Sequence, residues 1–228
     1  MHCRGVSSRR SQKDVALTQG RDEYFVRRLE AFGDVVIGFS LALLALSLIV
    51  PNHAASLISN PVWFSAYVWT FALVCSMWGS HYWTFRYVFV PTRPSILLNY
   101  AKLGLLVLLI FFVQVLLKAF EVGNDRDVIV ANELYWGCLS AYWIAAGLLL
   151  AIGMRARATP LAPEIAQRCV VRIWRVAATV PMVLTGILLG ARGTADQMAM
   201  TVALFMAAGT AIGAFAGRTA ARVARVPS

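Results

Sequence analysis

Ionisable side chains stand at the entrance to a very apolar stretch of this chain. Residues 28–50 read RLEAFGDVVIGFSLALLALSLIV, in which Arg28 and Asp34 lead into an apolar run long enough to cross a bilayer. A carboxylate beside hydrocarbon must find hydrogen-bond donors or water, because an unpaired charge is costly there. A simple anchor would not need Asp34. The pattern therefore predicts a helix that is built into a functional assembly.

More polar residues follow at the same depth of the next two apolar segments. Trp78 and His81 are three residues apart and share one helix face, and Asn99 opens the third segment. We expect Asp34 to pair with Arg28 or with His81. An interfacial belt is the alternative, since Trp, His and Arg are common at membrane surfaces, but a belt does not explain the carboxylate. His81 could relay protons, although a hydrogen-bonded structural role is commoner for a membrane histidine.

The composition indicates an integral membrane protein. Hydrophobic residues make up 59% of the 228 residues, and the mean hydropathy is +0.67. A soluble domain of this length could not bury that much apolar surface. Continuous apolarity without strict alternation favours helices over barrel strands. The sequence predicts an all-α, polytopic fold with six transmembrane helices. The segments are Ala31–Val50, Val62–Tyr87, Ile96–Ala119, Val128–Met154, Val170–Gly190 and Met198–Gly217.

The basic residues are distributed unevenly between the two sides of these segments. With the N-terminus inside, only Lys118, Arg126 and Arg192 of the 21 Lys and Arg residues fall outside, and Lys102 is counted among the inner ones. This bias follows the positive-inside rule and predicts a multi-pass protein of the cell (plasma) membrane with both termini cytoplasmic. The net charge of +10 is then a topology signal. Its expected partners are anionic lipids and not nucleic acid.

The chain divides into a membrane domain over residues 28–217 and basic cytoplasmic tails over residues 1–27 and 218–228. The first tail is polar, and the apolar run behind it is too long for a signal peptide, so we expect a flexible arm. The sequence contains no nucleotide loop, zinc motif or nucleophile elbow, and its four cysteines lack metal-ligand spacing. No enzymatic activity, cofactor or metal site is predicted.

Two adjacent faces of the first predicted helix are candidates for a functional surface. Phe39, Leu43 and Leu46 lie on a bulky apolar stripe, and Ser40 and Ser47 lie on a narrower, slightly polar stripe beside it. Gly38, Ala42 and Ala45 form a small-residue face that another helix can approach closely. Periodicity alone does not separate a functional surface from ordinary packing surfaces, and packing is the commoner role.

Glycines recur every four residues in the last two segments. Gly186 and Gly190 lie on one helix face, and Gly209, Gly213 and Gly217 lie on another. This spacing predicts close backbone contact between helices and does not identify a substrate.

The polar cluster resembles the signature of the transmembrane protein 175 family, which are potassium channels of endolysosomes and bacteria. The residues that carry the resemblance are Arg28, Phe32 and Asp34 of an Arg-x-x-x-Phe-Ser-Asp motif, Trp78 and His81 of a Trp-x-x-His motif, and Asn99. In this family the network joins the helices near the cytoplasmic side. The bacterial type has six helices in each chain, forms a homotetramer, and lines its pore with the first helices.

The resemblance implies a potassium-permeable leak channel whose partners are potassium ions and further copies of the chain. The implied constriction is Phe39, with Leu43 and Leu46 further out, and Ser40 and Ser47 are candidate polar residues of the pore. Gly33 replaces the Ser of the signature, and Ala42 stands where a Thr is usual. The sequence contains no TVGYG segment, which excludes a filter built of that carbonyl stack.

Two other functional classes stay open. A proton-coupled secondary transporter would use Asp34 and His81, and a non-conducting membrane scaffold would result if Phe39 sealed the axis permanently. Transporters usually contain inverted repeats and bind their substrates near mid-membrane. Here no repeat is visible, and the titratable groups lie at one end of the predicted spans. The channel is therefore the favoured reading.

Overall fold

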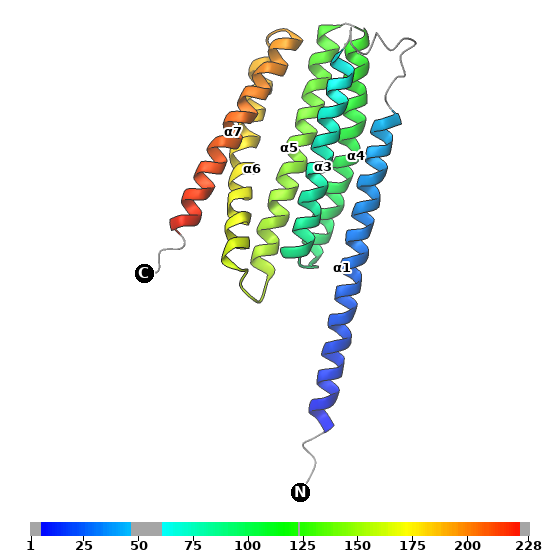
Figure 1. Ribbon diagram of the computed structural model, residues 1–228, viewed down its shortest axis with the longest axis vertical. Coiled ribbons are helices and arrows are strands. Elements are labelled where there is room, and N and C mark those ends of the chain that lie inside the picture. Colours follow the sequence, from blue (N-terminus) through cyan, green and yellow to red (C-terminus); the bar gives the residue numbers. More distant parts are fainter. Residues whose placement is uncertain (1–5, 47–60, 123, 224–228) are drawn as a thin grey trace.

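The computed structural model describes residues 6–46, 61–122 and 124–223, and these residues form a set of six long α-helices (Figure 1). The helices are α1 (Val6–Leu46), α3 (Pro61–Tyr87), α4 (Arg93–Val122), α5 (Asp125–Ala156), α6 (Pro163–Gly190) and α7 (Ala195–Val223). No strand occurs within these three ranges. The prediction of an all-α fold is confirmed for this part of the chain.

Five of the helices, all except α3, are long and apolar enough to cross a membrane when the described residues are searched. The prediction of six spans is therefore confirmed for five. α3 packs against α1 and also contacts α4, so it belongs to the same bundle.

Consecutive helices run in opposite directions, so the basic helix ends meet at one end of the bundle (Figure 1). Arg86 lies in the last turn of α3, and Arg155 and Arg222 lie in the last turns of α5 and α7. Arg93 begins α4 at the same end. The end with the N-terminal part of α1 is therefore strongly basic, as the sequence pattern predicts, and we call it the basic end.

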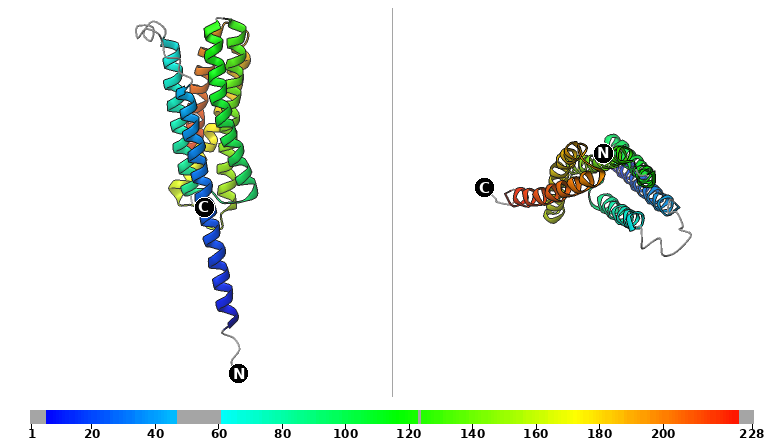
Figure 2. Two further views of the ribbon diagram at one scale, coloured as in Figure 1. Left: turned by 90° about the vertical axis from the view of Figure 1, so that its right-hand side faces the viewer. Right: turned by 90° about the horizontal axis from the view of Figure 1, so that it is seen from above.

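The first and last helices are longer than their apolar segments. α1 begins at Val6 and projects well beyond the bundle (Figures 1 and 2), so residues 6–27 continue the helix where the sequence suggested a flexible arm. α7 continues to Val223, which makes part of the predicted C-terminal tail helical as well. Apolarity marks where a helix is embedded in a membrane, but a helix continues through polar residues when nothing ends it.

α6 and α7 form an antiparallel hairpin along one side of the molecule (Figure 1). A Cβ added to Gly213 would lie 2.6 Å from Cα of Arg175, and one added to Gly190 would lie 2.7 Å from Cα of Met198. Both distances are shorter than real Cβ contacts, so only glycine permits this approach. The predicted close backbone contact between helices is confirmed for this pair.

α1 packs one face against α3 and α4, beside the main hydrophobic core. Leu44 of α1, Val74 of α3, and Leu106 and Leu109 of α4 are almost completely buried there. The opposite face of α1 has no partner among the residues that the structure describes. This arrangement fixes which side chains of α1 face the neighbouring helices and which face outward.

Candidate functional site

A hydrogen bond joins α1 and α3 toward the basic end. The indole Nε1 of Trp78 donates to Oδ1 of Asp34, and the two atoms are 2.9 Å apart. The carboxylate thus has the donor that its position requires, but the donor is neither of the expected partners, Arg28 and His81. The Arg28 guanidinium lies instead 5.7 Å from the ring centre of Tyr24, on its own helix. Asp34 therefore acts as an acceptor between helices and not as half of the predicted ion pair.

A second polar contact joins α3 and α4 in the interior. His81 is 1% exposed and Lys102 is 3% exposed, and Nδ1 of His81 lies 3.1 Å from Nζ of Lys102. An ammonium group has three donors and no acceptor, so beside a charged Lys102 the Nδ1 atom must accept. The imidazole proton is then on Nε2, on the other edge of the ring.

That other edge of His81 faces the backbone of α1 at Gly33. A Cβ added to Gly33 would lie 2.6 Å from Cε1 of the imidazole. The position therefore has no room for the Ser of the signature while His81 keeps this orientation. The replacement of Ser by Gly removes a hydroxyl, and the imidazole occupies the space that the hydroxyl would need.

The remaining motif residues lie on both sides of these contacts. Asn99 is fully buried, and neither atom of its amide has a hydrogen-bond partner among the described residues. Phe32 makes an edge-to-face contact with Tyr100 across α1 and α4, with 6.1 Å between ring centres. Motif residues thus contribute to contacts across each pair of helices α1–α3, α1–α4 and α3–α4.

Lys102 is the residue of this network that sequence reasoning missed. The charge pattern placed it among the inner basic residues, whereas it lies inside α4 and is almost completely buried. A signal was present, because Lys102 follows Asn99 by three residues and so shares its helix face. A charged side chain within an apolar span also marks a functional position by default.

The outward face of α1 is apolar from Phe32 to Leu46. Phe39 is 69% exposed and Leu46 is 81% exposed, with Phe32, Val35 and Leu43 also exposed on this face. Gly38 is exposed beside them, and a Cβ added there would meet nothing within 4 Å. The three residues predicted to form a constriction, Phe39, Leu43 and Leu46, therefore share a stripe that the rest of the described chain leaves exposed.

The two predicted pore hydroxyls do not join this stripe. Ser40 is 1% exposed, and its hydroxyl donates to the carbonyl oxygen of Val36 at 2.8 Å. It lies on the side of α1 that packs against the other helices, so its expected place on the pore surface does not fit the structure. Ser47 lies outside the described residues.

The comparison with protein families matches residues 28–110 to a family model described as the endosomal/lysosomal potassium channel TMEM175. The matched region begins at Arg28 and ends within α4, so it contains all six predicted motif residues and Lys102. The searches of curated proteins and of solved structures gave no match. The matched family is one of potassium channels and not of enzymes. The similarity of this chain to the TMEM175 potassium channel family thus extends over residues 28–110.

Proposed function

We propose that this chain is the subunit of a passive, potassium-permeable leak channel in which the α1 helices of a homotetramer surround a central pore. The family match supports potassium as the permeant ion. The observation that carries the arrangement is the exposed apolar stripe with Phe39, Leu43 and Leu46 on α1. One chain holds a single copy of the matched segment, so a path lined by α1 needs several chains around an axis.

The two outward faces of α1 suit two different neighbours. Gly38, Ala42 and Ala45 are exposed and small, so an adjacent subunit can approach α1 closely on that side. Phe39 and Leu43 lie on the adjacent bulky face, which would then be turned toward the axis. A helix within a closed ring of subunits needs a small-residue face for its neighbour and a second face for the axis. An apolar helix that faces only lipid needs no such division.

The pore would be controlled by wetting of an apolar constriction at Phe39. Without a TVGYG filter, ions would pass a narrow apolar ring that conducts when water fills it and closes when water leaves it. Asp34 would stabilise the pore helix from outside the conduction path, because Trp78 already engages its carboxylate. The positive-inside bias supports a plasma-membrane orientation in which the basic end faces the cytoplasm.

Potassium efflux from liposomes tests the proposal. Phe39→Ala widens the constriction and Phe39→Asn makes it easier to wet, so both variants should raise the efflux rate over the wild type. Phe215→Ala is the matched control, since Phe215 is 73% exposed on α7, a helix that packs against α6 and α5. Unchanged efflux in both Phe39 variants would remove this residue from the pore.

The same measurement separates the alternatives. A channel carries potassium down its gradient without a coupled ion. Saturable flux with counter-transport would indicate the secondary transporter. If neither the wild-type protein nor Phe39→Ala conducts, the non-conducting scaffold is indicated.

A further inference from the structure

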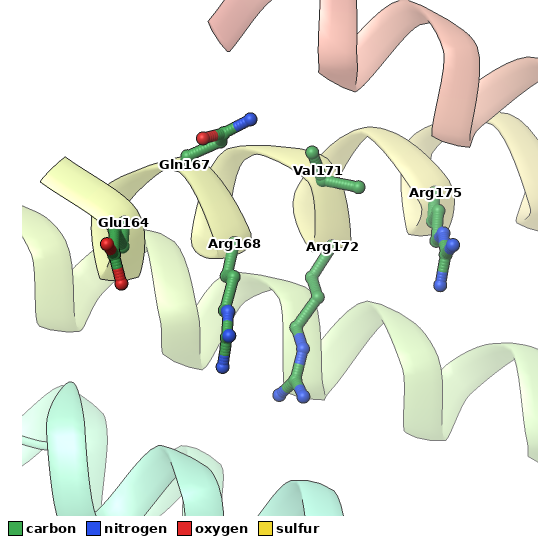
Figure 3. A pocket seen from close by; sticks show the side chains of 6 residues that line it. All are labelled: Glu164, Gln167, Arg168, Val171, Arg172 and Arg175. Atoms are coloured by element: carbon green, nitrogen blue, oxygen red, sulfur yellow. The ribbon is translucent and has the colours of Figure 1, made fainter.

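The basic end of α6 contains a cavity of about 510 Å³ that the proposed channel function does not use. It is lined by Glu164, Gln167, Arg168, Val171, Arg172 and Arg175. The three arginines are spaced by four and three residues, which places them on one helix face. Figure 3 shows their side chains pointing the same way, toward α5, while Gln167 points to the opposite side of α6. Three guanidinium groups and one carboxylate make this cavity strongly positive.

Arg172 has an unused hydrogen-bond donor in this cavity. Its guanidinium lies 4.1 Å from the ring centre of Trp83 on α3, which holds the side chain in place. Its Nη1 atom is buried and has no hydrogen-bond partner among the described residues. A buried donor without an acceptor is costly, and a fixed guanidinium with neighbouring positive charge suits a phosphate oxygen.

A second, mostly apolar cavity of about 260 Å³ lies between α3, α5 and α6. It shares Arg172 and Arg175 with the basic cavity, and its other lining residues are Ser76, Met77, Ser80, Tyr142, Trp143, Ala146, Gly147, Leu150 and Val176. A free phosphate ion would occupy only the basic cavity. A molecule with an anionic head and a hydrocarbon chain matches both.

We propose that these two neighbouring cavities, which share Arg172 and Arg175, bind one anionic phospholipid, with its phosphate on Arg168, Arg172 and Arg175 and part of an acyl chain in the apolar cavity. The depth on α6 fits this ligand, because residues 176–190 carry no charge and residues 164–175 carry all the charges of the helix. The arginines thus lie where the apolar half of α6 begins, at the level of lipid headgroups. The bound lipid connects α3, α5 and α6. This inference requires membrane insertion but not ion conduction.

Native mass spectrometry of the full-length protein released from vesicles of phosphatidylglycerol and phosphatidylcholine tests the phosphate contact. We expect retained phosphatidylglycerol on the wild type and about tenfold weaker retention in Arg172→Gln. Arg175→Gln provides a second variant at an exposed position. Arg155→Gln is the matched control, because Arg155 is a basic residue of the same end that lines neither cavity. Equal loss in Arg155→Gln, or no loss in either pocket variant, overturns the proposal.

Two further arms separate a lipid from other occupants. Ala146→Phe fills the apolar cavity without changing charge and should lower phosphatidylglycerol retention, whereas Ile144→Phe, at an exposed position of α5, should not. Excess inorganic phosphate should leave the retained lipid in place. Displacement by phosphate together with full retention in Ala146→Phe would show a simple anion site. A lipid-free particle with Arg172 cross-linked to a neighbouring subunit would show that a second copy covers the cavities. Either result overturns the assignment to a lipid.

Discussion

Gly33 of α1 lies directly against His81 of α3, and a Cβ at position 33 would come within 2.6 Å of Cε1 of the imidazole. At this point the distance between α1 and α3 is therefore set by the contact between Gly33, whose side chain is a hydrogen atom, and the imidazole ring of His81. His81 in turn contacts Lys102 on its other edge, so its ring cannot move away freely. The packing of α1, the proposed pore helix, thus depends on the residue type at position 33.

The first prediction concerns this contact. Gly33→Ala should force α1 and α3 apart and lower the stability of the protein by about 1–3 kcal/mol, the usual cost of overpacking. The thermal unfolding midpoint of the purified protein in detergent measures the change. Gly104→Ala, on α4, meets nothing within 4 Å and should leave the midpoint nearly unchanged. Equal midpoints for the two variants would show that the α1–α3 contact is not tight.

The second prediction concerns the buried pair of His81 and Lys102. His81→Leu leaves a buried ammonium group without its acceptor, so it should destabilise the protein by about 3 kcal/mol or more. Lys102→Met keeps a similar shape without the charge and should cost about 1 kcal/mol, the value of one lost hydrogen bond. The double variant should recover most of the stability lost in His81→Leu.

Thermal unfolding of the three variants checks this order. A double variant less stable than His81→Leu alone would contradict it, because the cost would then come from lost packing and not from an uncompensated charge.

The helical architecture can be predicted from the sequence because the length of an apolar segment and the asymmetry of charge each depend on many residues together. A dozen residues can change without moving an apolar segment. The close approach of α6 and α7 is also predictable, since the spacing of Gly209, Gly213 and Gly217 directly specifies a flat helix face.

The detailed contacts of the site are harder to predict, because they depend on how each helix is rotated. The need of Asp34 for a donor is clear from its position, but whether Arg28, His81 or Trp78 reaches it depends on the rotation of α1 against α3. Ser40 was expected beside the pore, and the same rotation turns it toward the core. Lys102 was misplaced because a charge count does not record the depth of a residue within its helix.

The third prediction tests the bond between Asp34 and Trp78 as a double-mutant cycle. Asp34→Ala and Trp78→Phe should each destabilise the protein, and the double variant should cost about 1 kcal/mol less than the sum, since both single changes disrupt one hydrogen bond. The unfolding midpoints of the four proteins give the coupling. Strictly additive effects would mean that the two side chains contribute independently, and that Asp34 relies on a different donor.

The fourth prediction tests the axis that the proposed function requires. In a background without Cys3, Cys75, Cys138 and Cys169, a Phe39→Cys variant should form covalent dimers on mild oxidation, because α1 helices around a narrow constriction bring equivalent residues together. A disulfide needs Cβ atoms about 3.5–4.5 Å apart, so the reaction reports true proximity. Leu97→Cys is the control, since Leu97 is 71% exposed on α4 and lies off the proposed axis. Dimers are read on a non-reducing gel of protein in vesicles. The opposite result would be an oligomeric particle in which Leu97→Cys cross-links and Phe39→Cys does not. In that case α4 and not α1 lies at the symmetry axis, and the conduction path must be placed elsewhere.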